Sequence, residues 1–140
     1  MVVETGRDIL LLTDQPLSLD ELYRAVESEE TGAIVTFSGV VRRTEKGRAI
    51  EALDYDHYAA MAEKEIRRLM EEAHRRWPIQ RIALAHRWGR VNVGDPSVIV
   101  AVGAAHRAEA FEACRFLIDE LKRSVPIWKS VGGDNGTTQP

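Results

Sequence analysis

Two lysines lie seven positions apart near the end of the chain, Lys122 and Lys129, on either side of a Pro-Ile-Trp segment. Lys122 ends an apolar stretch with helical spacing, and Lys129 follows a tryptophan in a stretch that favours a strand. A buried lysine with cationic neighbours can exchange protons near neutral pH and then acts as an acid or a base. The alternative is structural: Lys122 complements a helix dipole, and Lys129 extends past the tryptophan into solvent. Both interpretations stay open from these residues alone.

A second basic group, His106 and Arg107, lies where a predicted strand turns into the last predicted helix. The first N–H groups of a helix lack partners within the helix and attract anions. Residues 103–105 contain no Ser, Thr, Asp or Asn to cap them. An arginine at this point favours a phosphate or carboxylate ligand. The pair predicts an anion site, with a helix start capped by His106 or by water as the alternative.

The composition narrows the class of protein. The chain has 140 residues, 44% of them apolar and 29% charged, which is typical of one soluble globular domain. The formal net charge of -3 does not favour nucleic-acid binding. No apolar run approaches the ~20 residues that span a bilayer, and the N-terminus lacks the features of a signal peptide. We therefore expect a cytoplasmic protein that binds neither nucleic acid nor membrane.

Cys114 is the single cysteine, so an intrachain disulfide is not possible. It recurs at helical spacing with Phe111, Ile118 and Leu121, which favours a buried structural thiol over a nucleophile. The four histidines show no metal-ligand spacing with one another or with the cysteine. We expect neither a metal site nor a resident cofactor.

The sequence predicts a mixture of strands and helices, with some strands following one another directly. Helices are predicted at residues 18–28, 60–77 and 107–123, the first with a capping box and the second ended by a proline. Strands are predicted at residues 8–13, 32–42, 49–58, 80–89, 97–103 and 125–131, with a short strand and turn at 90–96 and a charged loop at 43–48. We expect the large apolar side chains Phe37, Met61, Trp77 and Trp128 in the core.

This order predicts a single α+β domain over residues 1–131. The polar, glycine-rich residues 132–140 are predicted to be disordered. The Gly-Gly pair in that tail is not terminal, so the tail is not itself a carrier of an activated carboxylate.

Five blocks of the sequence, in one order and spacing, resemble the catalytic, large subunit of molybdopterin synthase, the MoaE family. They are FSGVVR at residues 37–42, DHYAAMAEKEI at 56–66, RWPIQRIALAHRWGRVNVGDPSVIVAV at 76–102, AHRAEAFEACRFLIDELK at 105–122 and PIWK at 126–129. The resemblance implies an α/β hammerhead-type fold with an additional antiparallel sheet.

The resemblance also implies a sulfurtransferase of molybdenum cofactor biosynthesis. Its substrate would be cyclic pyranopterin monophosphate, which receives the two sulfurs of the molybdopterin dithiolene. The sulfur would come from the thiocarboxylate on the Gly-Gly C-terminus of a small ubiquitin-like carrier subunit of the MoaD type. The large subunit would form a central dimer, with one small subunit at each end of a heterotetramer.

By position, the resemblance assigns Lys122 and Lys129 as catalytic residues that hold carboxylates and shuttle a proton. Lys122 is the stronger candidate for the proton transfer. The expected substrate-binding residues are Arg42, Val40, Val41, His106, Arg107, Ser130 and Val131. This sequence differs from other members at Val40, where a lysine can occur, and after Lys129, where an acidic residue is usual.

A helix over residues 108–121 is roughly 21 Å long at 1.5 Å per residue, with His106 and Arg107 at one end and Lys122 at the other. One small pocket does not easily contact both ends. The first hypothesis is a site shared across the dimer, and the alternative is separate roles for the two groups.

Two other functions remain possible from the residues alone. The first is a non-catalytic module that binds a phosphorylated metabolite and has no need of the two lysines. The second is an RNA-binding domain that uses the loop from Arg42 to Arg48, which the acidic balance does not favour.

Overall fold

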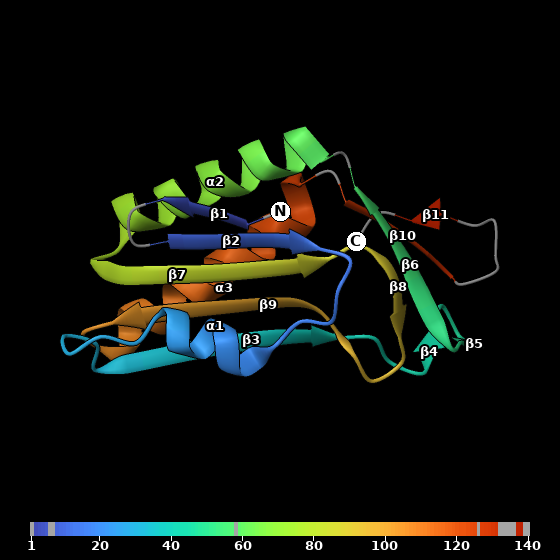
Figure 1. Ribbon diagram of the computed structural model, residues 1–140, viewed down its shortest axis with the longest axis horizontal. Helices are drawn as coiled ribbons and strands as arrows, with labels where there is room; N and C mark the ends of the chain where they lie inside the picture. Colours follow the sequence, from blue (N-terminus) through green and yellow to red (C-terminus); the bar gives the residue numbers. More distant parts are fainter. Residues whose placement is uncertain (1, 6–7, 58, 126, 132–136, 139–140) are drawn as a thin grey trace.

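A five-stranded sheet forms the body of the computed structural model, which describes residues 2–5, 8–57, 59–125, 127–131 and 137–138 (Figure 1). Its strand order is β1-β2-β7-β9-β3. Only the β2–β7 pair is parallel, and the other neighbours are antiparallel. The strands are β1 (Val2–Thr5), β2 (Asp8–Thr13), β3 (Ala33–Val40), β7 (Ile79–Arg87) and β9 (Pro96–Ala104).

Helices cover both faces of this sheet. Side chains of α2 (Ala59–Arg76) and α3 (Arg107–Ser124) pack with Ile82 and Leu84 of β7, and those of α1 (Leu19–Ala25) pack with the alternate residues Ala83 and Ala85. Strands β7 and β9 are therefore buried on both faces, which explains their nearly continuous apolar sequences. The α1 helix begins at its predicted cap, since the Ser18 hydroxyl accepts a hydrogen bond from the Glu21 amide.

A second, antiparallel sheet stands across one end of the first (Figure 1). Its strand order is β11-β10-β6-β8, and a separate hairpin of β4 and β5 lies beside it. The elements are β4 (Thr44–Glu45), β5 (Arg48–Ala49), β6 (Ala52–His57), β8 (Gly89–Asn92), β10 (Ile127–Val131) and β11 (Thr137–Thr138). The predicted α+β class with an additional antiparallel sheet is confirmed.

Several local predictions differ from the structure. Strand β1 was not predicted, and the charged loop of residues 43–48 contains the β4–β5 hairpin. Met61, predicted to lie in the core, is 57% exposed on the solvent side of α2. Phe111, which shares the helical spacing of Cys114, is 60% exposed on α3. Phe37 and Trp77 do pack against the core as predicted.

Parts of two predictions lie outside the described residues. The first is the prediction that Trp128 lies in the core, because its side chain is outside the described part of the chain. Most of the predicted disordered tail, residues 132–140, is another, and its two described residues, Thr137–Thr138, pair with β10. Within the described part of the chain, no helix is long and apolar enough to cross a membrane.

Candidate functional site

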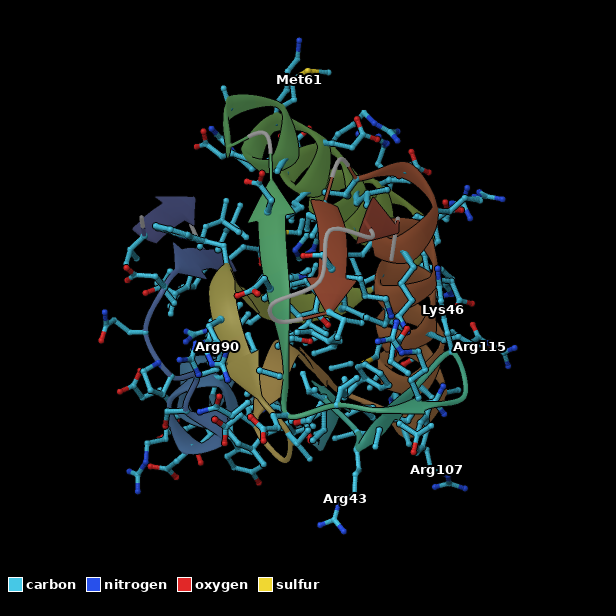
Figure 2. The ribbon with its side chains drawn as sticks, turned by 90° about the vertical axis from the view of Figure 1, so that its right-hand side faces the viewer. Arg43, Lys46, Met61, Arg90, Arg107 and Arg115 are labelled. Carbon is cyan, nitrogen blue, oxygen red and sulfur yellow. The ribbon has the colours of Figure 1, made fainter. Side chains whose placement is uncertain are left out.

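A pocket of about 440 Å³ opens where the second sheet meets the end of the first sheet and the last turns of α3. Figure 2 views the molecule from this end, with β6 and β10 in front and α3 at the side. The lining residues come from β3, β6, β7, β9, β10, α3 and the β4–β5 hairpin. They are Phe37, Ser38, Gly39, Val40, Val41, Arg42, Glu45, Leu53, Tyr55, His86, Ser97, Val98, Ile118, Leu121, Lys122, Ile127 and Lys129.

Lys122 is placed at the pocket by the last turns of α3. The preceding residues Ile118 and Leu121 are buried in the core and also line the pocket. Their packing fixes the rotation of the helix, so that Lys122 follows the apolar stripe at its solvent edge. Lys122 therefore lines the pocket while its side chain stays exposed to solvent.

Lys129 is placed by the second sheet. It lies in β10, opposite Tyr55 of β6, and both residues line the pocket. Its Nζ atom is 3.3 Å from Oε1 of Glu45, and the two side chains are 25% and 14% exposed. The ion pair is thus shielded from solvent on most sides, where a charge interaction is stronger than at an open surface.

Arg42, Val40 and Val41 extend from the end of β3 into the lining. The pairing of β3 with β9 shifts register between Gly39 and Val40, which changes the direction of the strand as it reaches the pocket. A Cβ atom on Gly39 would lie 2.7 Å from Cγ1 of Val98, so the absence of a side chain allows this close approach.

The structure brings five of the nine predicted site residues together, namely Val40, Val41, Arg42, Lys122 and Lys129. Ser130 and Val131 follow Lys129 in β10, but they are not part of the lining. His106 and Arg107 are exposed at the start of α3, at the other end from Lys122. The 18 residues of α3 make it about 27 Å long at 1.5 Å per residue. The pocket of one chain therefore does not include both basic groups.

Figure 2 shows Arg107 at the lower edge of the molecule, as it does Arg43, and Arg107 is not among the lining residues of the pocket. His106 is the N-cap residue of α3, and its side chain makes no capping hydrogen bond. The alternative of a helix start capped by the His106 side chain is therefore wrong.

Glu45, Tyr55 and His86 are among the polar lining residues that were not predicted. His86 is buried and meets the edge of the Tyr55 ring, with ring centroids 5.4 Å apart and planes at 73°. Its Nδ1 atom is 3.0 Å from the carbonyl oxygen of Arg87. A single histidine in an apolar strand gives no local signal of a site, since only the pairing of the second sheet brings Tyr55 to it.

Cys114 lies on the buried face of α3, as the sequence predicted. It is not among the residues that line the pocket. Burial raises the pKa of its thiol to about 11, because the thiolate would lose its hydration. The thiol is therefore neutral at physiological pH and is not a nucleophile for this pocket.

The chemistry of the pocket is that of an anion site. Arg42, Lys122 and Lys129 contribute cationic groups, and apolar side chains from α3, β6 and β10 line the same pocket. Ammonium and guanidinium groups in such a setting bind phosphate or carboxylate. A lysine in the same place can also donate a proton to an oxygen that leaves the substrate.

Comparison with known proteins agrees with this geometry. The model of the MoaE family, described as "MoaE protein", matches residues 12–124. This chain belongs to the MoaE family. The "Molybdopterin synthase catalytic subunit" of Bos taurus is 44% identical to it over 91% of this chain and 68% of the bovine protein. The protein of the same name from Escherichia coli is 42% identical over 86% of this chain and 81% of its own length.

Solved structures of the MoaE family have the same fold. A crystal structure of molybdopterin synthase from Staphylococcus aureus matches with a TM-score of 0.86 and 30% identity, over 98% of both chains. A complex of subunits 1 and 2 of the molybdopterin-converting factor from Helicobacter pylori matches with a TM-score of 0.76 and 25% identity, over 93% of this chain and 88% of that one.

Proposed function

We propose that this MoaE chain is the catalytic subunit of a molybdopterin synthase. In this role it transfers sulfur from the C-terminal thiocarboxylate of a small ubiquitin-like subunit to cyclic pyranopterin monophosphate and so forms the dithiolene of molybdopterin. The observation that carries the proposal is the convergence of Arg42, Lys122 and Lys129 on one pocket in a chain of this family. The Helicobacter pylori complex of two subunits supports a small-subunit partner of the MoaD type.

We assign the two lysines to the reaction itself. Lys129, at the second sheet, holds the thiocarboxylate of the carrier tail, and Lys122 donates the proton as sulfur adds to the pterin and oxygen leaves. Arg42 binds an anionic group of the pterin, and Val40 and Val41 form the adjoining wall. Ser130 and Val131 contribute through the backbone of β10, which positions Lys129.

We further propose that the site is completed by a second copy of the chain. His106 and Arg107 lie at the opposite end of α3 from Lys122, so they are too distant to join the pocket of their own chain. In a closed dimer the same residues of the mate can face the pocket, because a two-fold interface presents each surface to its copy. They would then bind the phosphate of the pterin. A cytoplasmic location is also part of this proposal.

Mass spectrometry tests the reaction directly. The full chain is incubated with cyclic pyranopterin monophosphate and a carrier whose C-terminus is a thiocarboxylate. The expected product is a pterin with two added sulfurs, together with a carrier whose terminus is an ordinary carboxylate. Unchanged pterin would contradict the proposal and favour a module that only binds a phosphorylated metabolite.

A further inference from the structure

Among the described residues that line the pocket, Glu45 is the only carboxylate. Its position is unexpected in a site that binds anions, since a fixed negative charge repels both a phosphate and a carboxylate ligand. The Glu45 carboxylate lies against the Lys129 ammonium, 3.3 Å away, and the side chain is only 14% exposed. The Glu45 carboxylate is therefore paired with Lys129, one of the cations that the proposed reaction requires.

The hairpin that carries Glu45 has an apolar anchor at its base. Val41 and Ile50, just outside the two short strands, are buried in a cluster with Leu53 and Val91. Beyond this base the hairpin is a ladder of two residue pairs, Thr44 with Ala49 and Glu45 with Arg48. A two-stranded ladder of this length is marginally stable without further contacts.

The tip of the hairpin is a tight turn. Lys46 and Gly47 have φ angles of 52° and 77°, in the left-handed region that a short hairpin connection requires. Figure 2 shows Lys46 at this tip, on the side of the molecule where α3 runs. The ion pair to Lys129 thus connects the hairpin, beyond its apolar base, to the second sheet at the pocket.

We propose that Glu45 is an internal competitor for the tail of the carrier subunit. Before the carrier tail binds, the Glu45 carboxylate holds Lys129 in the position that the terminal thiocarboxylate takes during the reaction. This inference rests on the function proposed above and adds the means by which the hairpin responds to the carrier. A lysine ammonium exchanges one carboxylate for another readily, because it is a point charge with three rotatable donors. Arrival of the tail therefore releases Glu45 and frees the hairpin to move.

The binding of two synthetic peptides to the full chain tests this competition. Both peptides end in Gly-Gly, one with a free carboxylate and the other with a C-terminal amide, and NMR titration up to millimolar concentrations gives the Kd. Glu45→Gln keeps the shape of the side chain and removes its charge. We expect the free-carboxylate peptide to bind about threefold to fivefold more tightly to this variant, as for the loss of one partly exposed ion pair. The amide peptide is expected to bind with unchanged affinity.

Two further variants make the test specific. Glu51→Gln removes an equal charge from an exposed side chain outside the pocket lining, and its affinity for both peptides is expected to equal that of the wild type. In a Lys129→Ala background the effect of Glu45→Gln is expected to disappear, because the group for which the two carboxylates compete is gone.

Weaker binding of the free-carboxylate peptide to Glu45→Gln, or an equal gain for the amide peptide, would overturn the inference. So would a failure of all variants to bind either peptide at millimolar concentration. These results are separate from the test of the proposed function, which measures sulfur on the pterin. If the wild-type chain transfers sulfur but Glu45→Gln does not bind the free-carboxylate peptide more tightly, the proposed function stands and only the role of Glu45 as a competitor is overturned.

Discussion

His74 of α2 and Asp8 of β2 form a partly buried pair, in which Nε2 of the histidine lies 2.9 Å from Oδ2 of the aspartate. The same carboxylate accepts a hydrogen bond of 3.0 Å from the backbone N–H of Ile82 in β7. One side chain thus joins a helix to the two parallel strands of the main sheet. These contacts are outside the pocket, so they contribute to stability rather than to chemistry.

Replacing Asp8 therefore tests how much these contacts between α2 and the main sheet contribute to stability. We expect Asp8→Ala to lower the free energy of unfolding by about 1–3 kcal/mol, because it leaves the Ile82 N–H and the His74 ring without an acceptor. Urea denaturation measures the change. Asp14→Ala is the matched control, since Asp14 is exposed and contacts the neighbouring Gln15, and its effect is expected to stay within ~0.5 kcal/mol. Equal losses for the two variants would contradict the assignment.

The buried thiol of Cys114 predicts a dependence of stability on alkaline pH. Burial raises the pKa of this thiol in the folded chain to about 11, from the ordinary value of 9.0. Below pH 8 the thiol is neutral in both states, so it contributes no pH dependence. Between the two pKa values the unfolded chain loses this proton while the folded chain keeps it, so stability falls as the pH rises.

Comparison with Cys114→Ala isolates this effect from other titrations. Relative to pH 8, wild-type stability is expected to fall by about 1 kcal/mol more than that of the variant by pH 10. The cavity that alanine leaves lowers the stability of the variant equally at both pH values, so it does not alter the difference. Urea denaturation at pH 8, 9 and 10 gives the two slopes. A steeper fall in the variant would be the opposite of this expectation.

Local sequence patterns predicted most of the secondary structure because packing and period agree there. The β-branched run of β9 and the apolar stripe of α3 have one interpretation each, and both elements formed within a few residues of the expected bounds. The exposed side chains of Phe111 and Met61 show the limit of reasoning from periodicity. Periodicity places a residue on a side of the helix, but the width of the covered face depends on the elements that pack against it.

The site was only partly predictable for a related reason. The closeness of Lys122 and Lys129 in sequence made them candidates, and the resemblance to the MoaE family assigned them a catalytic role. Glu45 was not predicted, because it lies far from Lys129 in the sequence. Their contact depends on the pairing of β6 with β10. The hairpin itself gave a weak signal, because its turn places Lys46 at positive φ, where Asn or Gly is usual.

Lys122 is expected to be required for sulfur transfer and dispensable for folding. Lys122→Ala should abolish transfer in the mass-spectrometric assay, while the loss of a lysine at a helix C-terminus lowers stability by only about 0.3–1 kcal/mol. Lys122→Arg keeps the charge, but a guanidinium gives up a proton far less readily than an ammonium. It is therefore expected to bind the pterin without restoring transfer.

Lys64→Ala is the control for both Lys122 variants, because it removes an exposed lysine from α2, outside the pocket. It is expected to transfer sulfur at the wild-type rate. Wild-type turnover by Lys122→Ala would show that Lys122 takes no part in the reaction. Full activity of Lys122→Arg would instead limit the role of Lys122 to its charge.

A shared site predicts that two inactive variants restore each other. Lys122→Ala lacks the proton donor at one end of α3, and Arg107→Ala lacks the proposed phosphate ligand at the other. In a mixed dimer, one pocket carries both lesions and the other carries none, so activity is expected to return to as much as about a quarter of the wild-type value in an equal, randomly exchanged mixture. Native mass spectrometry of chains with different tags verifies the exchange. If each pocket used residues of one chain only, every pocket in the mixture would keep a lesion, and activity would stay absent after complete exchange.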